Sequence, residues 1–171
     1  MKLGRWTTAA AAIVFATACS KAPAPLNDAE RAAIADSVSQ MTTQFLAGMA
    51  QPTPEFYLSH FTGNDWVHAE YGMVYPTYDS TVKVVRATLR PGTSMKVTFS
   101  QKHVTVLDRD VVVFTALMNG TMKDSAGTEM PFNEAWMAVY HRTADGWKIA
   151  ADHESTAPSA PEPVKPKHRA R

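Results

Sequence analysis

The chain has 171 residues, a formal net charge of +1 and a single cysteine. This length suits one domain around one hydrophobic core, and it leaves no room for a second domain of ordinary size. With one cysteine, the chain cannot form an intramolecular disulfide.

The near-neutral net charge hides an acidic body and a basic tail. Residues 26–157 contain ten Lys and Arg against fifteen Asp and Glu, a net charge of −5. Because nucleic-acid binding needs clustered cations, this body argues against a nucleic-acid partner. The tail, residues 158–171, is basic, rich in proline and without apolar periodicity, so we expect it to be disordered. It is either a solvated terminus or a contact to an anionic surface.

The N-terminus has the pattern of a secretory signal. Lys2 and Arg5 precede an apolar run, residues 6–18, that is too short to span a bilayer. We therefore predict a signal peptide over residues 1–18 and an exported, periplasmic protein.

Cys19 follows the small residues Ala16, Thr17 and Ala18 directly. This arrangement resembles the lipobox of bacterial lipoproteins, which implies lipidation of Cys19 and a tether over residues 19–25. Ser20 after the cysteine favours the outer membrane. The other reading is an ordinary signal peptide with a chance cysteine.

Helices are predicted first along the body. Asn27 and Glu30 form a capping-box pattern before a helix over residues 28–47, whose apolar residues recur at helical spacing. Thr53 and Pro54 predict the cap and first residue of a short second helix reaching Phe61. A third helix is predicted over residues 80–90.

Strands dominate the remainder. Residues 66–74 predict a short strand pair or a bent strand, interrupted by Gly72. Four long strands are then expected over residues 95–107, 111–122, 129–141 and 147–155, and their short connections predict an antiparallel meander. A change in the apolar alternation predicts a bulge near Lys102 or His103.

Alternation also predicts which residues of the last two strands face the core. His153 has the parity of Trp147 and Ile149, so we expect it to point inward. Glu134 has the parity of Trp136 on the preceding strand, which places it either among aromatic rings or on a solvent-facing edge.

The order of these elements and the closing segment Asp-Gly-Trp-Lys-Ile-Ala-Ala-Asp-His-Glu-Ser, residues 145–155, resemble the nuclear transport factor 2-like (NTF2-like) superfamily. The similarity is to its SnoaL-like bacterial branch, which shares its fold with ketosteroid isomerase, scytalone dehydratase and polyketide cyclases. The resemblance covers residues 27–156. It implies an α+β domain over residues 26–157, with three N-terminal helices packed on a strongly curved, mainly antiparallel β-sheet that forms a cone with an internal pocket.

Within such a pocket, His153 and Glu134 are the candidate catalytic residues, because an imidazole and a shielded carboxylate can move protons near neutral pH. Each has a structural alternative, as a hydrogen-bonded core histidine and a solvent-facing glutamate. The candidate ligand-binding residues share aromatic or polar side chains suited to a mixed pocket, and are Tyr57, Trp66, His68, Tyr71, Phe114 and Trp136.

Metal and cofactor signals are weak in this sequence. His68 and Glu70 share a strand face and are candidate metal ligands together with His153, but their spacing is not diagnostic, and no metal is predicted. Phosphate-binding loops, the Gly-x-Ser-x-Gly elbow and paired cysteines are missing, so no cofactor is expected.

Two functions remain. The first is an envelope-tethered module that binds a small apolar or aromatic ligand in its pocket, or forms a homodimer through the open sheet face. The second is a cofactor-independent isomerase, cyclase or dehydratase with His153 as the general base.

Overall fold

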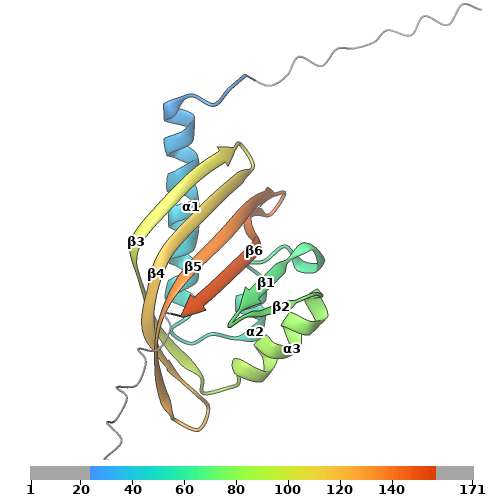
Figure 1. The fold of residues 1–171 in the computed structure, drawn as a ribbon, viewed down its shortest axis with the longest axis vertical. Helices are drawn as coiled ribbons and strands as arrows, with labels where there is room; N and C mark the ends of the chain where they lie inside the picture. Colours follow the sequence, from blue (N-terminus) through green and yellow to red (C-terminus); the bar gives the residue numbers. More distant parts are fainter. Residues whose placement is uncertain (1–23, 157–171) are drawn as a thin grey trace, which may run out of the picture.

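The computed structural model describes residues 24–156, and the predicted signal peptide, Cys19 and the tail at 158–171 lie outside the described residues. In chain order the elements are α1 (Asp28–Gly48), α2 (Pro54–Leu58), the 3-10 helix η1 (Gly63–Asp65), β1 (Val67–Glu70), β2 (Met73–Tyr75), α3 (Tyr78–Thr88), β3 (Ser94–Asp108), β4 (Val111–Lys123), β5 (Glu129–Thr143) and β6 (Gly146–Thr156). The predicted α+β class is confirmed (Figure 1). Over residues 24–156, no helix has both the length and the apolar character needed to cross a membrane.

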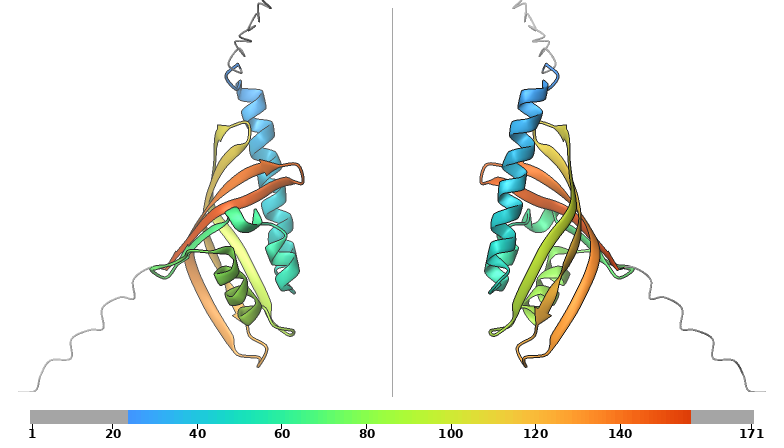
Figure 2. Two further views of the ribbon diagram at one scale, coloured as in Figure 1. Left: turned by 90° about the vertical axis from the view of Figure 1, so that its right-hand side faces the viewer. Right: turned by 90° about the vertical axis from the view of Figure 1, so that its left-hand side faces the viewer.

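The helix α1 begins at the predicted capping box. The Asn27 side chain accepts a hydrogen bond from the Glu30 amide, and the Glu30 carboxylate accepts one from the Asn27 amide. Figure 2 shows α1 along one face of the sheet, where Val38 and Phe45 are buried. Thr42 on the same stripe makes a 3.0 Å hydrogen bond to the Tyr140 hydroxyl of β5. This contact ties the helix to the sheet.

The two shorter helices lie on the same face of the sheet as α1 (Figures 1 and 2). Thr53 caps α2 as predicted, but α2 ends at Leu58 and does not reach Phe61. Thr77 caps α3, which therefore starts two residues before the predicted position. Together the three helices cover one side of the sheet and leave the other side open.

The sheet has six strands in the order β2-β1-β6-β5-β4-β3. The predicted meander is confirmed, because β3 to β6 pair antiparallel in sequence order. The pairing of β1 with β6 is parallel, which makes the sheet mixed. A register shift between Ser100 and His103 confirms the predicted bulge in β3. The bulge lies in an edge strand of the sheet. The sheet is not strongly curled, and the predicted cone is not seen.

A second bulge, in β6, corrects the predicted orientation of His153. Tyr140 pairs with Ile149 and Val139 pairs with Ala151, so Ala150 is an extra residue in the ladder. Because side chains alternate along a strand, one extra residue reverses the facing of everything after it. Asp152 is buried, and His153 is exposed on the opposite face.

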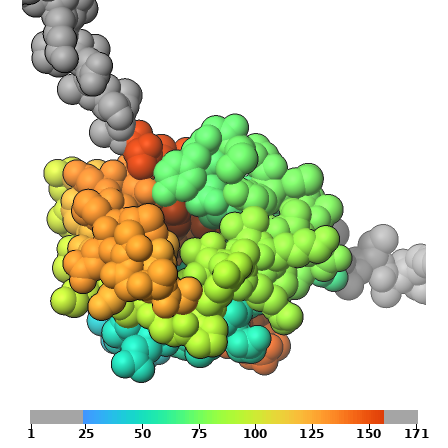
Figure 3. Space-filling view, turned by 90° about the horizontal axis from the view of Figure 1, so that it is seen from below, coloured from blue at the N-terminus to red at the C-terminus, as the bar shows by residue number. Residues whose placement is uncertain are grey.

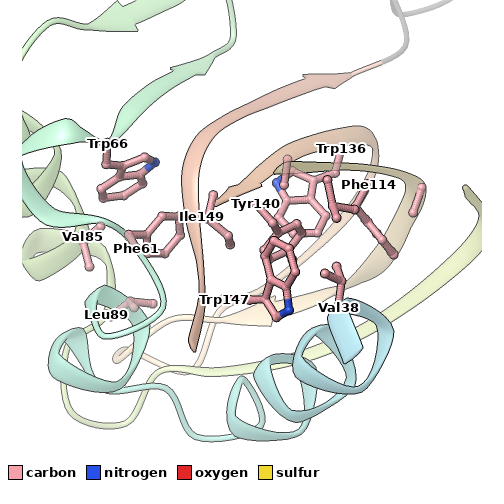
Figure 4. Close-up of a cluster of buried hydrophobic side chains, with 13 residues drawn as sticks. Val38, Phe61, Trp66, Val85, Leu89, Phe114, Trp136, Tyr140, Trp147 and Ile149 are labelled. Carbon is pink, nitrogen blue, oxygen red and sulfur yellow. The ribbon is translucent and has the colours of Figure 1, made fainter. Parts of the chain in front are cut away.

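The hydrophobic core lies between the sheet and the helices. Figure 4 shows Ile149 of β6 between a group containing Phe61 and Trp66 and a group containing Trp136 and Tyr140. Ile149 and Tyr140 are fully buried. The parity predicted for β5 is confirmed, because Glu134, Trp136 and Tyr140 are all buried on the helix-covered face.

Candidate functional site

A pocket of about 790 Å³ opens between the helices and the sheet, beside this core. In Figure 3 the surface is hollowed between the orange β4–β5 region and the green α3 and β1–β2 regions, with red β6 atoms visible in the hollow. The apolar part of the lining includes Phe45, Leu46, Met49, Val84, Val85, Leu89, Met95, Val97, Phe99, Met118, Met122, Met130, Phe132 and Trp136. The polar part includes Tyr57, His68, Glu70, Tyr71, Asn133, Glu134 and Glu154.

Most of the residues predicted to bind a ligand line this pocket. They are Tyr57, Trp66, His68, Tyr71 and Trp136. Phe114 does not line it, because its ring is 1 % exposed and packs in the core against Phe99 and Trp136. The Trp136 ring stacks on Phe99 with centroids 5.1 Å apart, so an aromatic pair forms one wall of the pocket.

Strand register assembles the polar end. The parallel pairing of β1 with β6 places His68 beside Asp152 and Glu70 beside Glu154. On the other side of β6, Trp136 of β5 pairs with Glu154. Three neighbouring strands therefore bring His68 and Glu70 of β1, Asp152 and Glu154 of β6 and Glu134 of β5 to the same face of the sheet.

Asp152 joins two of these side chains beneath the pocket. Its carboxylate accepts hydrogen bonds from Trp66 Nε1 at 2.6 Å and from His68 Nδ1 at 3.0 Å. Glu70 Oε2 lies 3.7 Å from His68 Nε2. Burial disfavours the charged imidazole, but the bond to Asp152 and the nearby Glu70 outweigh it and raise the pKa of His68 to about 10. At neutral pH, His68 is therefore a positively charged hydrogen-bond donor already paired with carboxylates.

Glu134 accepts a hydrogen bond from Tyr71, a residue of the turn between β1 and β2. Its side chain is buried, and its Oε1 accepts a 2.5 Å hydrogen bond from the Tyr71 hydroxyl. Tyr71 and Gly72 have φ values of 49° and 77°, the left-handed conformations that a tight turn between two strands requires. This turn holds the Tyr71 hydroxyl at the edge of the pocket.

Glu154 differs from the other acidic groups. It lines the pocket, and no side chain or amide within residues 24–156 forms a hydrogen bond with its carboxyl group. Burial, followed by the nearby charges of Asp152 and Glu134, raises the pKa of Glu154 from its ordinary 4.5 to about 8. Glu154 is therefore a largely protonated acid at pH 7.

Sequence alternation did not predict Glu154 as a pocket residue or Asp152 as the carboxylate beneath the pocket. Both were assigned to the outer face by an alternation that ignored the bulge at Ala150. The sequence gives no direct signal for this placement, because an Asp-x-Glu pair on a strand is also typical of a face exposed to solvent.

His153 lies instead over a shallower hollow of about 340 Å³ on the open face of the sheet, with Thr115, Leu117, Ala135 and Met137. Its Nδ1 is 3.1 Å from the Ala69 carbonyl oxygen. His68 and Glu70 share a face as expected, but His153 is on the other side, so these three do not come together as metal ligands. Within the described part of the chain, no group of three His, Cys, Asp or Glu side chains is placed to hold a metal ion.

Comparison with protein families identifies the fold. The model of the SnoaL-like domain matches residues 38–159, and the chain belongs to this family. No match was found among curated proteins.

Solved structures show the same fold at low sequence identity. A candidate scytalone dehydratase from Novosphingobium aromaticivorans is 12% identical with a TM-score of 0.64, over 84% of this chain and 99% of that one. A ketosteroid isomerase-like protein from Erwinia carotovora atroseptica is 16% identical with a TM-score of 0.58, over 73% and 97%. The association domain of C. elegans CaMKII is also 16% identical with a TM-score of 0.58, over 76% and 100%. The chain thus has the NTF2-like fold that these structures share.

Proposed function

We propose that this protein binds a small, mainly apolar molecule in the pocket between its helices and its sheet, while tethered to the cell envelope through lipidated Cys19. The observation that carries the binding proposal is the pocket itself. Its volume of about 790 Å³ lies within the usual range of ligand sites, and apolar walls combined with a few polar groups are typical of them. The family resemblance implies a ligand pocket inside a cone, and in this proposal the pocket between the helices and the sheet is the ligand site instead.

A fluorescent probe and a pocket-blocking variant test this proposal. N-phenyl-1-naphthylamine brightens in apolar sites and is uncharged at neutral pH. Val84 lines the pocket from α3 and is 37% exposed, so Val84→Trp places a bulky ring at the rim with little strain. Ala87→Trp, on the exposed side of the same helix, is the matched control. We expect saturable probe binding that Val84→Trp weakens at least tenfold and Ala87→Trp leaves unchanged; equal affinities in both variants would contradict the proposal.

The tether is tested separately, in cells that process lipoproteins. The native chain should incorporate labelled palmitate and fractionate with membranes, whereas Cys19→Ser should do neither. A native chain that stays unlabelled would refute the tether and leave the pocket proposal intact.

Self-association through the open sheet face is a second candidate. It is supported by Met137, which is 44% exposed beside Leu117 and Ala135 on that face. Sedimentation should then show a homodimer that Met137→Lys converts to a monomer. A monomeric native protein would exclude it.

The enzymatic alternative with His153 as general base receives no support from the pocket. His153 is on the opposite face of the sheet, away from Glu134 and the tyrosines. A general base must lie within hydrogen-bonding reach of the bound substrate, and His153 does not reach this pocket.

A further inference from the structure

We propose that the pocket selects a hydrophobic cation: a molecule with an apolar body and an ammonium group, whose charge lies beside the carboxyl groups of Glu134 and Glu154. This inference rests on the proposed binding function and adds the chemical class of the ligand.

The charges around the pocket favour a cation. Its lining contains three glutamates, Glu70, Glu134 and Glu154, and among the described lining residues there is no lysine or arginine. The one cationic group, His68, is already paired with Asp152 at 3.0 Å and lies 3.7 Å from Glu70. An anionic ligand would therefore meet unbalanced negative charge, whereas an ammonium group would reduce it.

Glu154 is the glutamate of the pocket lining whose carboxyl group remains available to the charge of a ligand. It is half-buried in the lining, and within residues 24–156 its carboxyl group has no hydrogen-bond partner, whereas Glu70 and Glu134 each accept a bond from a tyrosine hydroxyl. Because no protein group competes for this carboxyl group, it is open to a charge-assisted hydrogen bond from an ammonium donor. The geometry therefore points to Glu154 as the principal contact of the ligand's charge.

The apolar walls suit the rest of such a molecule. Trp136 and Phe99 present stacked rings, and five methionines, Met49, Met95, Met118, Met122 and Met130, add deformable surface. Aromatic faces also attract organic cations, so a ligand with an alkylated or aryl-substituted amine gains contacts along its whole length.

Binding of a cation should also release a proton. Glu154 is surrounded by Asp152 on its own strand, Glu134 on β5, His68 and Glu70 on β1, and the hydroxyls of Tyr57 and Tyr71. The neighbouring carboxylates oppose its ionisation in the empty pocket. An ammonium group beside it reverses that balance, so the Glu154 proton leaves to solvent as the ligand binds.

Three probes that share one skeleton test the inference: 4-phenylbutylamine, 4-phenylbutanol and 4-phenylbutyrate. Calorimetric titration at pH 7 in two buffers of different ionisation enthalpy gives both the affinity and the number of protons released. We expect the amine to bind at least tenfold more tightly than the alcohol with release of close to one proton, and the carboxylate to bind most weakly.

The variant Glu154→Gln separates charge recognition from simple apolar binding. It keeps the shape of the protonated side chain and should bind the alcohol as the native protein does, while the preference for the amine falls to a few-fold and proton release disappears. Glu129→Gln, an exposed change at the start of β5, should keep the native pattern.

Amine and alcohol binding with equal affinity, or tighter binding of the carboxylate, would overturn the cation inference and leave the binding function standing. Failure of all three probes to bind at millimolar concentration would instead count against the proposed function, together with the inference built on it.

Discussion

Replacing Glu154 with glutamine should stabilise the folded protein at neutral pH and weaken the dependence of its stability on pH. In the folded state the pKa of Glu154 is raised to about 8, whereas the unfolded chain gives it the ordinary value of 4.5. A carboxyl group with a raised pKa binds its proton more tightly when folded. Its contribution to stability is therefore complete below pH 4.5 and is lost as the pH rises toward 8.

The size of this effect follows from the two pKa values. Each unit of difference corresponds to about 1.4 kcal/mol, so the unfolding free energy should fall by roughly 2–3 kcal/mol between pH 5 and pH 7. Domains of this size are usually stable by about 5–15 kcal/mol, which makes such a loss easy to measure. Glu154→Gln has no proton to lose and should be more stable than the native protein by about 3 kcal/mol at pH 7.

Urea denaturation at half-unit steps from pH 5 to pH 7, followed by tryptophan fluorescence, measures this difference. The range stops at pH 7 because the raised pKa of His68, about 10, adds a further loss of stability as the pH rises above the ordinary value of 6.5. The exposed variant Glu129→Gln serves as a control for general charge effects. Parallel pH profiles for Glu154→Gln and the native protein would refute the assignment of Glu154 as a protonated acid.

Two further predictions concern the hydrogen bonds beneath and beside the pocket. Asp152→Asn should lower the unfolding free energy by about 3 kcal/mol and lower the pKa of His68 in an NMR titration, because it weakens a buried ion pair and the acceptor of Trp66; an unchanged imidazole titration would contradict this. Tyr71→Phe should cost about 1–2 kcal/mol in urea denaturation, because buried Glu134 loses a charge-assisted hydrogen bond; an unchanged denaturation midpoint would show that water replaces the hydroxyl.

The helices and the meander could be predicted because their signals are local. The capping pair Asn27 and Glu30 and the cap at Thr53 each involve residues three apart, and both are present in the structure. The bulge in β3 was also visible in sequence, because the apolar residues on either side of Gln101 change parity.

The site could not be predicted in the same way, because it depends on register between distant strands. The bulge at Ala150 leaves no change of apolar parity to detect, since the residues beyond it are Asp152, His153 and Glu154. Nothing in the sequence indicates that β1 pairs in parallel with β6, the pairing that brings His68 to Asp152 across 84 positions of the chain. The aromatic residues were placed more successfully, because large rings in strands are usually buried.

The extra residue in β6 means that one strand supports two separate tasks. Before Ala150, its inward side chains, Trp147 and Ile149, fill the core, and after it they are Asp152 beneath the pocket and Glu154 in its lining. Deleting Ala150 would therefore turn His153 inward and turn Asp152 and Glu154 to the opposite face of the sheet. A single codon lost at this point would change the chemistry of the interior by exchanging which of the existing side chains face it, with no substitution.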